Sequence, residues 1–242
     1  MARGQPDYGV YQPKKTGGTL ADLGDLAVRL GSIVEFDRRG DIVYLDDFED
    51  TVLKWSRLVA VGGSCLLNSD NVKSGSQAVK ISTIANINSE VNLYKSFVIL
   101  GTLLIGIEIS ICDLFPTQDF YFSYSYWDGF VGRRARIWFN NATDTFYVDD
   151  TVRGNWTMIA HVQAMRRTEV LFYAIKLVVD FETNRYKRML FAGKEYDLSG
   201  VVIPPTVLAG GEYFQVTVNI SNTAAAAGDV WVDDFILTQN EP

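Results

Sequence analysis

The chain has 242 residues and a formal net charge of −7, with 48% hydrophobic and 13% aromatic residues. The acidic balance argues against a protein that binds nucleic acid through its phosphates, because such a protein requires a basic surface. The apolar content is too high for an intrinsically disordered chain and predicts a substantial core, and the length fits one large all-β domain or two small domains.

The first 40 residues predict an arm in front of the folded domain. Residues 1–18 have no regular hydrophobic period and no apolar stretch typical of a signal peptide, so we expect the chain to fold in the cytoplasm of the cell that makes it. Residues 19–31 predict a short helix, with Thr19 as its N-cap and Gly31 at its end. The apolar positions of this helix recur at three- and four-residue spacing: Leu20, Leu23, Leu26, Ala27 and Leu30.

From residue 41 the pattern changes to short β-type segments separated by Gly, Asn, Asp and Ser. Strands are predicted at 42–48, 64–67, 77–84, 90–99, 103–112, 119–126, 134–140, 144–149, 156–162, 169–180, 185–191, 213–220 and 229–238. Spacing of this kind is typical of an antiparallel β-sandwich of the jelly-roll or concanavalin-like type, which we expect to occupy residues 41–242. The most apolar window, 97–109, is too short to span a membrane, so no membrane association is expected.

An Asp-Asp-Phe triplet occurs near both ends of this domain, at 46–48 and at 233–235. Because strand side chains alternate, one acid of each pair shares a face with core residues, and a buried carboxylate there requires a cation or several hydrogen bonds. If the first and last strands are neighbours, these carboxylates meet at one site: Asp46 or Asp47, Glu49, and Asp233 or Asp234. Calcium suits such a set of oxygen ligands, whereas the alternative is that loop amides satisfy the carboxylates.

Three segments resemble jelly-roll carbohydrate-binding modules: "DFED" followed by Trp55 (47–55), "SGSQAVKIS" (74–82) and "VWVDDFILT" (230–238). Such modules commonly hold a structural calcium where the first strand, the following Gly-Ser loop and the last strand meet. The resemblance implies calcium ligands from the side chains of Asp47, Glu49 and Asp234 and from a backbone carbonyl near Ser74. Residues 175–200 are also similar to the two-stranded ribbon of laminin-G-like and other concanavalin-like domains.

Few residues could carry catalysis or a disulfide. His161 is the single histidine, so a Ser-His-Asp or Cys-His centre would depend on it alone, and no nucleophile motif surrounds it. The E-x-D-x-x-E strand of concanavalin-like glucanases is missing, since Glu195-Tyr-Asp197 is followed by Leu-Ser-Gly. We therefore predict a protein that is not an enzyme. Cys65 and Cys112 lie in apolar segments and are expected to be buried and unpaired.

An aromatic segment at 120–140 offers the best surface for sugars, whose apolar faces stack on rings beside polar groups. The candidate glycan-binding residues are Tyr124, Tyr126, Trp127, Trp138 and Arg136. Alternation places Phe120, Phe122, Tyr124 and Tyr126 on one face and Tyr121, Ser123, Ser125 and Trp127 on the other, and one of the two faces has to be core. A lectin-like glycan-binding module is one hypothesis for the function.

The arm supports the other hypothesis. A 40-residue appendage with a short Leu-spaced helix has little to pack against by itself, and such arms become ordered on a neighbouring subunit. Residues 26–50 are similar to the N-terminal parts of structural proteins of tailed bacteriophages, in which a short assembly segment precedes a jelly-roll domain. The resemblance implies a virion component, either a capsid decoration or a tail or adhesion subunit. Its arm would bind other copies of the chain, as a homo-oligomer, and other virion proteins.

Overall fold

The computed structural model describes residues 39–60, 62–86, 89–98, 101–113, 118–150, 156–161, 171–206 and 212–242. The predicted helix at 19–31 and residues 1–38 of the predicted arm lie outside these ranges. Within them the regular secondary structure consists of strands, and none of the described residues forms a helix that is long and apolar enough to cross a membrane.

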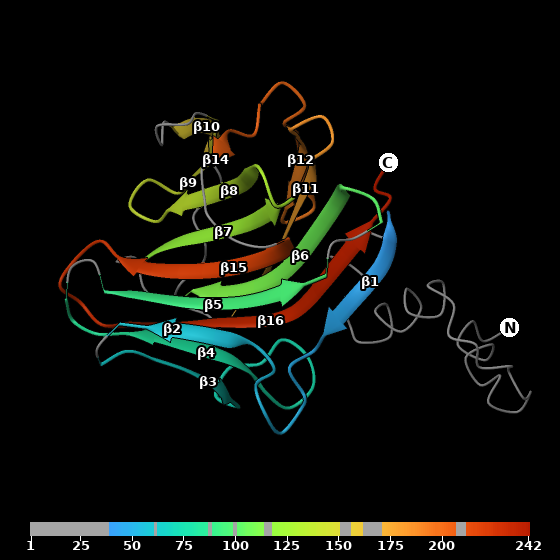
Figure 1. Cartoon of the computed structure of the whole chain (residues 1–242). Helices are drawn as coiled ribbons and strands as arrows, with labels where there is room; N and C mark the ends of the chain where they lie inside the picture. Colours follow the sequence, from blue (N-terminus) through green and yellow to red (C-terminus); the bar gives the residue numbers. More distant parts are fainter. Residues whose placement is uncertain are drawn as a thin grey trace, which may run out of the picture.

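Two antiparallel sheets make up the described part of the chain (Figure 1). The first sheet has the strand order β13-β12-β11-β6-β16-β4-β3, and β1 pairs with β16 as well. Its strands are β1 (Asp41–Asp46), β3 (Ser64–Asn68), β4 (Ala78–Thr83), β6 (Leu104–Asp113), β11 (Tyr173–Asp180), β12 (Arg185–Phe191), β13 (Lys194–Asp197) and β16 (Gly228–Gln239).

The second sheet has the strand order β10-β9-β8-β7-β15-β5-β2, with β14 paired to β8. Its strands are β2 (Ser56–Val59), β5 (Glu90–Phe97), β7 (Gln118–Trp127), β8 (Gly132–Asn140), β9 (Thr145–Asp149), β10 (Trp156–His161), β14 (Pro205–Thr206) and β15 (Tyr213–Asn222). The all-β antiparallel sandwich that the sequence predicts is therefore confirmed.

Each predicted strand corresponds to an observed one, with small differences at the ends. Three observed strands were not predicted, namely β2, β13 and β14. They have four, four and two residues, which is too short for an alternating pattern to be recognised. β2 and β13 also lie at sheet edges, where one side of the strand has no partner to bury it.

The first and last strands of the sandwich are neighbours (Figure 1). β16 has 12 residues, so it can pair with two strands along one side. Its first residues pair with β4, and its last residues pair with β1. Near this junction the rings of Trp55 and Phe235 meet with 4.7 Å between their centroids, and Trp55 also contacts Phe48. The two Asp-Asp-Phe triplets therefore lie next to each other, as the predicted pairing of the terminal strands requires.

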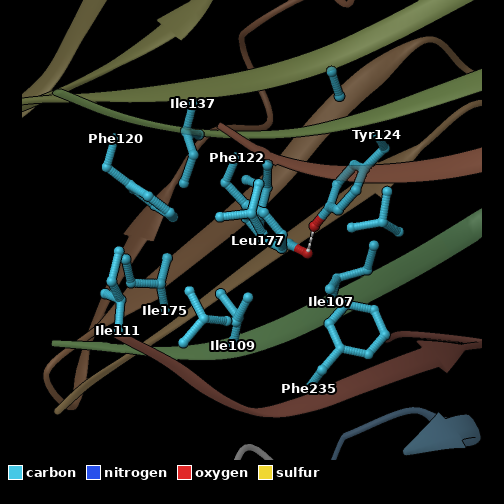
Figure 2. Packing of buried hydrophobic residues seen from close by; sticks show 14 of the residues in the cluster. Ile107, Ile109, Ile111, Phe120, Phe122, Tyr124, Ile137, Ile175, Leu177 and Phe235 are labelled. Atoms are coloured by element: carbon cyan, nitrogen blue, oxygen red, sulfur yellow. Dashed lines mark hydrogen bonds between the residues drawn. The ribbon is translucent and has the colours of Figure 1, made fainter. Parts of the chain in front are cut away.

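Apolar side chains of the two sheets face each other between the layers. Figure 2 shows Ile107, Ile109 and Leu177 of the first sheet opposite Phe122 and Tyr124 of the second, and all of these side chains are fully buried. Cys65 and Cys112 are buried and free, as predicted. The alternation along each strand thus separates one core face from one outer face.

Two buried tyrosines tie the sheets together through their hydroxyl groups. Tyr124 of β7 donates a hydrogen bond to the main-chain carbonyl of Leu177 in β11 (Figure 2). Tyr186 of β12 reaches in the opposite direction, where its hydroxyl accepts from the Arg136 amide (2.8 Å) and donates to the Asp149 carbonyl (2.9 Å). The β8–β9 ladder stops beside this point, so the Tyr186 hydroxyl bonds to backbone groups that the ladder leaves unpaired.

Candidate functional site

The first Asp-Asp-Phe triplet is satisfied by protein donors. The Asp46 carboxylate accepts hydrogen bonds from the Tyr44 hydroxyl (2.7 Å), the Trp55 indole (3.0 Å) and the Phe48 amide (3.1 Å). The Asp47 carboxylate accepts from the Glu49 amide at 3.2 Å. These acids therefore hold the turn that follows β1 and anchor Trp55 in the core.

Glu49 holds the loop that precedes β4. Its carboxylate accepts hydrogen bonds from the hydroxyl of Ser76 (2.5 Å) and from the amides of Ser76 (2.7 Å) and Gln77 (3.0 Å), and these bonds, the hydroxyl's above all, lower the pKa of Glu49. The loop approaches closely because Gly75 has a φ of 71° and no Cβ. A Cβ at Gly75 would lie 2.3 Å from the Glu49 carboxylate, so only glycine fits.

The second triplet lies at a bulge in β16. The pairing with β6 shifts between Asp233 and Ile236, and Asp234 has a left-handed φ of 48°. Asp233 is fully buried and accepts from the amides of Lys73 (2.9 Å) and Ser74 (3.2 Å). Burial raises the pKa of Asp233 to about 7, and the charge of Asp234 adds to the rise. The Asp234 carboxylate accepts from the Ser74 hydroxyl (2.8 Å) and lies 3.4 Å from the Lys73 ammonium.

The predicted calcium ligands lie along this junction, where each of them has a hydrogen bond to another protein group. Asp47, Glu49 and Asp234 already accept hydrogen bonds from protein donors, and the hydroxyl of Ser74 bonds to Asp234. No group of three or more acidic, histidine or cysteine side chains that could hold a metal occurs among the described residues, whereas calcium takes about six to eight oxygen ligands. Lys73 supplies a positive charge at this place, and calcium stays a prediction.

The outer face of the first sheet carries buried ion pairs. Glu241, just after β16, is fully buried and pairs with Lys176 of β11 (2.7 Å) and Arg188 of β12 (2.5 Å). Each of these buried charges is neutralised by its ion-pair partner and is shielded from solvent, so the group is not a candidate ligand site. The second sheet, by contrast, has a hollow on its outer face.

This hollow is a cleft of about 530 Å³, a size within the range of small-ligand sites. Its lining residues come from five strands of the second sheet: Glu90, Asn92, Tyr121, Ser123, Ser125, Arg134, Arg136, Trp156, Tyr213, Gln215, Thr217, Asn219 and Ser221. The residues between them along the same strands point into the core, so the cleft is built from the polar half of an alternating pattern.

The strand register explains why the surface is hollow. Side chains lie in rows across β8, β7 and β15: Arg134–Ser125–Gln215, Arg136–Ser123–Thr217 and Trp138–Tyr121–Asn219. In the first two rows the central residue is a serine, and the residues on its β8 side are arginines. Short side chains in the middle and long ones at the side leave a depression along β7.

Aromatic rings form one end of the cleft. Tyr121 stacks on Trp138 with 5.9 Å between ring centroids and an angle of 7° between the planes, and Trp156 packs at an angle against both rings. The indole of Trp138 donates to the buried carboxylate of Asp119 at 2.7 Å, which fixes its orientation. Burial raises the pKa of Tyr121, so its hydroxyl remains neutral and able to donate and accept hydrogen bonds.

The two arginines of the cleft differ in their partners. Arg136 pairs with the buried carboxylate of Asp149 at 2.9 Å and lies over the ring of Trp156, 4.4 Å from its centroid. Arg134 has no ion pair with any of the described residues. Burial lowers the pKa of Arg134, and the positive charge of Arg136 adds to this effect. Glu90, on the opposite side of the cleft, accepts a hydrogen bond from Asn92 at 3.2 Å.

The structure corrects part of the predicted glycan site. Tyr124 and Tyr126 point into the core, where Tyr124 is fully buried and Tyr126 stacks on Phe181, so they cannot contact a ligand in the cleft. The sequence predicts the alternation correctly. It does not tell which face of β7 is solvent-exposed, because both faces carry aromatic residues, so the predicted glycan site includes two residues of the core face.

The other three predicted residues belong to the cleft or support it. Arg136 lines the cleft, and the ring of Trp138 stacks on that of Tyr121, its cross-strand neighbour. Trp127 is buried and packs against Tyr213, a lining residue, with 5.5 Å between centroids.

β15 contributes more lining residues than any other strand of the second sheet, and none of them belongs to the predicted site. The signal was available, since every second residue of "YFQVTVNIS" (213–221) is polar or tyrosine while the others are apolar. A strand with such regular alternation has a solvent-facing side rich in hydrogen-bonding groups. Trp156 could not have been assigned in this way, because its segment shows no comparable pattern.

Comparison with solved structures agrees with the fold. The chain is similar to an endo-β-1,4-glucuronan lyase from the fungus Trichoderma reesei, with a TM-score of 0.56 and 12% identity over 81% of this chain and 95% of that one. It is also similar to the cellulose-induced protein Cip1, with a TM-score of 0.55 and 14% identity over 81% and 97% of the two chains. A laminarinase catalytic domain from Thermotoga maritima gives a TM-score of 0.53 and 11% identity over 84% and 100%.

These identities are low, so the likeness identifies a concanavalin-like β-sandwich and nothing finer. No protein-family model matches the sequence. No curated protein matches it either.

Proposed function

We propose that the protein is a glycan-binding protein that holds a saccharide in the cleft of its second sheet. The observation that carries this proposal is the composition of the cleft, which combines aromatic rings at both ends with hydroxyl and amide side chains between them. Sugar rings present apolar faces that stack on aromatic side chains and hydroxyl groups that bond to polar ones. Two of the similar structures are a glucuronan lyase and a laminarinase, which supports a saccharide as the ligand.

Within this proposal the protein binds its glycan without cleaving it. Hydrolysis of a glycosidic bond ordinarily uses two carboxyl groups about 5 to 10 Å apart that face the cleft. The acidic residue among the described lining residues is Glu90, and the nearby Asp149 is buried and paired with Arg136. His161 lies in β10, as a strand residue, and its side chain is outside the described part of the molecule.

Binding to a glycan array followed by calorimetry with the best ligand tests the proposal. We expect Trp156→Ala and Tyr213→Ala each to weaken binding by roughly 10-fold or more, because each removes a ring from the cleft. Tyr196→Ala is the matched control, since Tyr196 is a half-buried tyrosine of β13 in the other sheet. Melting temperatures of all three variants verify folding. An array without any glycan signal, or equal losses in all three variants, would reject the proposal.

A further inference from the structure

The cleft contains an arginine that forms no ion pair with the described part of the chain. Arg134 is next to Ser125 in the strand register and lines the cleft from β8. Among the described residues it forms no ion pair, and its buried Nε–H group donates no hydrogen bond. The two neighbouring arginines are different, because Arg133 lies 3.6 Å from Asp128 and Arg136 lies 2.9 Å from Asp149.

The guanidinium of Arg134 is partly withdrawn from water, and the carboxylate whose charge acts on it, Asp149, is already paired with Arg136. A guanidinium keeps its proton at any physiological pH, so the charge persists. The nearby Arg136 is a second positive charge on this side of the cleft, and its ion pair with Asp149 neutralises it. Among the described residues on the β8 side of the cleft, two arginines therefore share one paired carboxylate, and a bound anion would offset the remaining positive charge.

The opposite side of the cleft has the opposite charge. Glu90 belongs to β5, and β7 and β15 lie between β5 and β8, which places the two sides about 14 Å apart. Glu90 also lies in the row of Ser221 and Asp119, at the other end of the strands from the row of Arg134 and Ser125, so the two charges are diagonally opposed. An anionic group at Arg134 would avoid repulsion by Glu90 over this distance. Neutral hydroxyl and amide groups, such as Ser125 and Gln215, fill the space between them. The cleft thus offers one place for an anion and several for uncharged hydroxyl groups.

We propose that the glycan bound in the cleft is carboxylated, as in a polymer or oligomer of uronic acids, and that Arg134 pairs with one of its carboxylates. This inference rests on the proposed function, and it names the chemical class of the ligand. The guanidinium fork matches a carboxylate through two parallel hydrogen bonds, which the two terminal amino groups of Arg134 can donate. Arg136, held by Asp149 and Trp156, is a fixed second charge rather than the primary contact.

Calorimetry with a soluble polyuronate and with its carboxyl-reduced counterpart tests the inference on the full chain. The two polymers have the same backbone and differ only in the charged group. We expect the polyuronate to bind roughly 10-fold or more tightly than the reduced polymer at low salt, with an advantage that shrinks as salt is added.

Substitutions in β8 test whether Arg134 is the residue that pairs with the carboxylate. Arg134→Gln is expected to reduce affinity for the polyuronate to that for the reduced polymer while leaving the latter unchanged. Arg133→Gln removes the same charge from the preceding residue of β8, which is not part of the cleft lining, and is expected to retain the affinity of the original chain for both polymers. Arg134→Lys, which keeps the charge but lacks the planar fork, is expected to give an intermediate affinity and serves if Arg134→Gln does not fold.

The outcomes separate the two proposals. Equal affinity of the unmodified chain for both polymers would overturn the carboxylate assignment while leaving a glycan-binding cleft. Tighter binding of a sulfated derivative of the reduced polymer than of the polyuronate would also overturn it, in favour of a sulfate ester. Failure to bind either of these polymers or any glycan of the array would remove both proposals.

Discussion

At the scale of single residues, the hydroxyl of Tyr186 connects the core to the cleft. It bonds to the main-chain groups of Arg136 and Asp149, whose side chains form the ion pair at the cleft wall. Burial raises the pKa of this hydroxyl far above its ordinary value, so it is a neutral donor and acceptor at all relevant pH values. The residue therefore satisfies two backbone groups and fixes the position of two side chains of the site.

We expect Tyr186→Phe to lower the free energy of unfolding by about 1 to 3 kcal/mol, because a buried amide and a buried carbonyl lose their partner. Urea denaturation measures the change. Tyr94→Phe is the control, since Tyr94 lies on the outer face of β5 and its hydroxyl has no hydrogen bond to the described residues. The control is expected to change stability by less than about 0.5 kcal/mol. Equal effects of the two substitutions would refute a specific role of the Tyr186 hydroxyl.

Among the strands, β16 has a bulge that buries the Asp233 carboxyl group, and this burial predicts a pH dependence of the free energy of unfolding. Asp233 has a pKa of about 7 in the folded chain and 3.8 as its ordinary value. Between these values the folded state holds a proton that the unfolded state has lost, so stability falls as the pH rises through this window. Asp233→Asn stays neutral, and we expect its loss of stability between pH 5 and pH 8 to be smaller than that of the original chain by about 2 to 3 kcal/mol.

Urea denaturation at the two pH values measures this difference. Asp197→Asn is the control, because Asp197 lies in β13 and hydrogen bonds from Ser199 lower its pKa. Because its pKa is lowered, Asp197 changes the free energy of unfolding with pH only below about pH 4, which is outside the window from pH 5 to pH 8. If Asp233→Asn retains the full pH dependence of the original chain, the buried carboxylate is not its source.

The same junction decides the calcium hypothesis. Lys73 supplies a positive charge 3.4 Å from Asp234, and amides and hydroxyls donate to Asp47, Glu49 and one oxygen of Asp234, whereas the buried Oδ2 of Asp234 accepts no hydrogen bond from the described residues. A ligand that binds only the folded state raises the melting temperature by mass action. If the ligand set that the sequence predicts binds calcium, we expect a lower melting temperature in EDTA than in millimolar calcium chloride. Equal melting temperatures would contradict the calcium hypothesis and leave the ion pair with Lys73 as the compensation for the Asp234 charge.

At the scale of the whole molecule, the sequence predicts the layers of the sandwich better than its surface. Alternation in long strands such as β7 and β15 marks which residues are core, and the paired triplets indicate that β1 and β16 are neighbours. The cleft could not be predicted in the same way, because it depends on the register between β7, β8 and β15. A shift of two residues would keep every side chain on its face but would move Ser123 and Ser125 out of the rows that contain the arginines, and the alternation alone does not exclude such a shift.

The assembly hypothesis concerns residues 1–40, of which the structure describes only the last two. We propose, from the sequence, that this arm binds neighbouring copies of the chain in a virion. Light scattering of the full chain is expected to give a discrete oligomer, and deletion of residues 1–38 is expected to give monomers. The deletion leaves every strand of both sheets intact. The shortened chain should therefore retain the melting temperature and glycan affinity of the full chain, which distinguishes loss of assembly from loss of folding.

A monomeric full chain at high concentration would remove the basis for this proposal. Retained oligomers after the deletion would instead place the contact on the sandwich itself, where Phe130 of the β7–β8 turn is 94% exposed and held by hydrogen bonds from its own and the next amide to Asp128. The two hydrogen bonds hold the backbone of this turn, so the exposed ring is presented to solvent where another surface can contact it. Phe130→Ala in the shortened chain would then be expected to release monomers while the cleft, which Phe130 does not line, keeps its affinity.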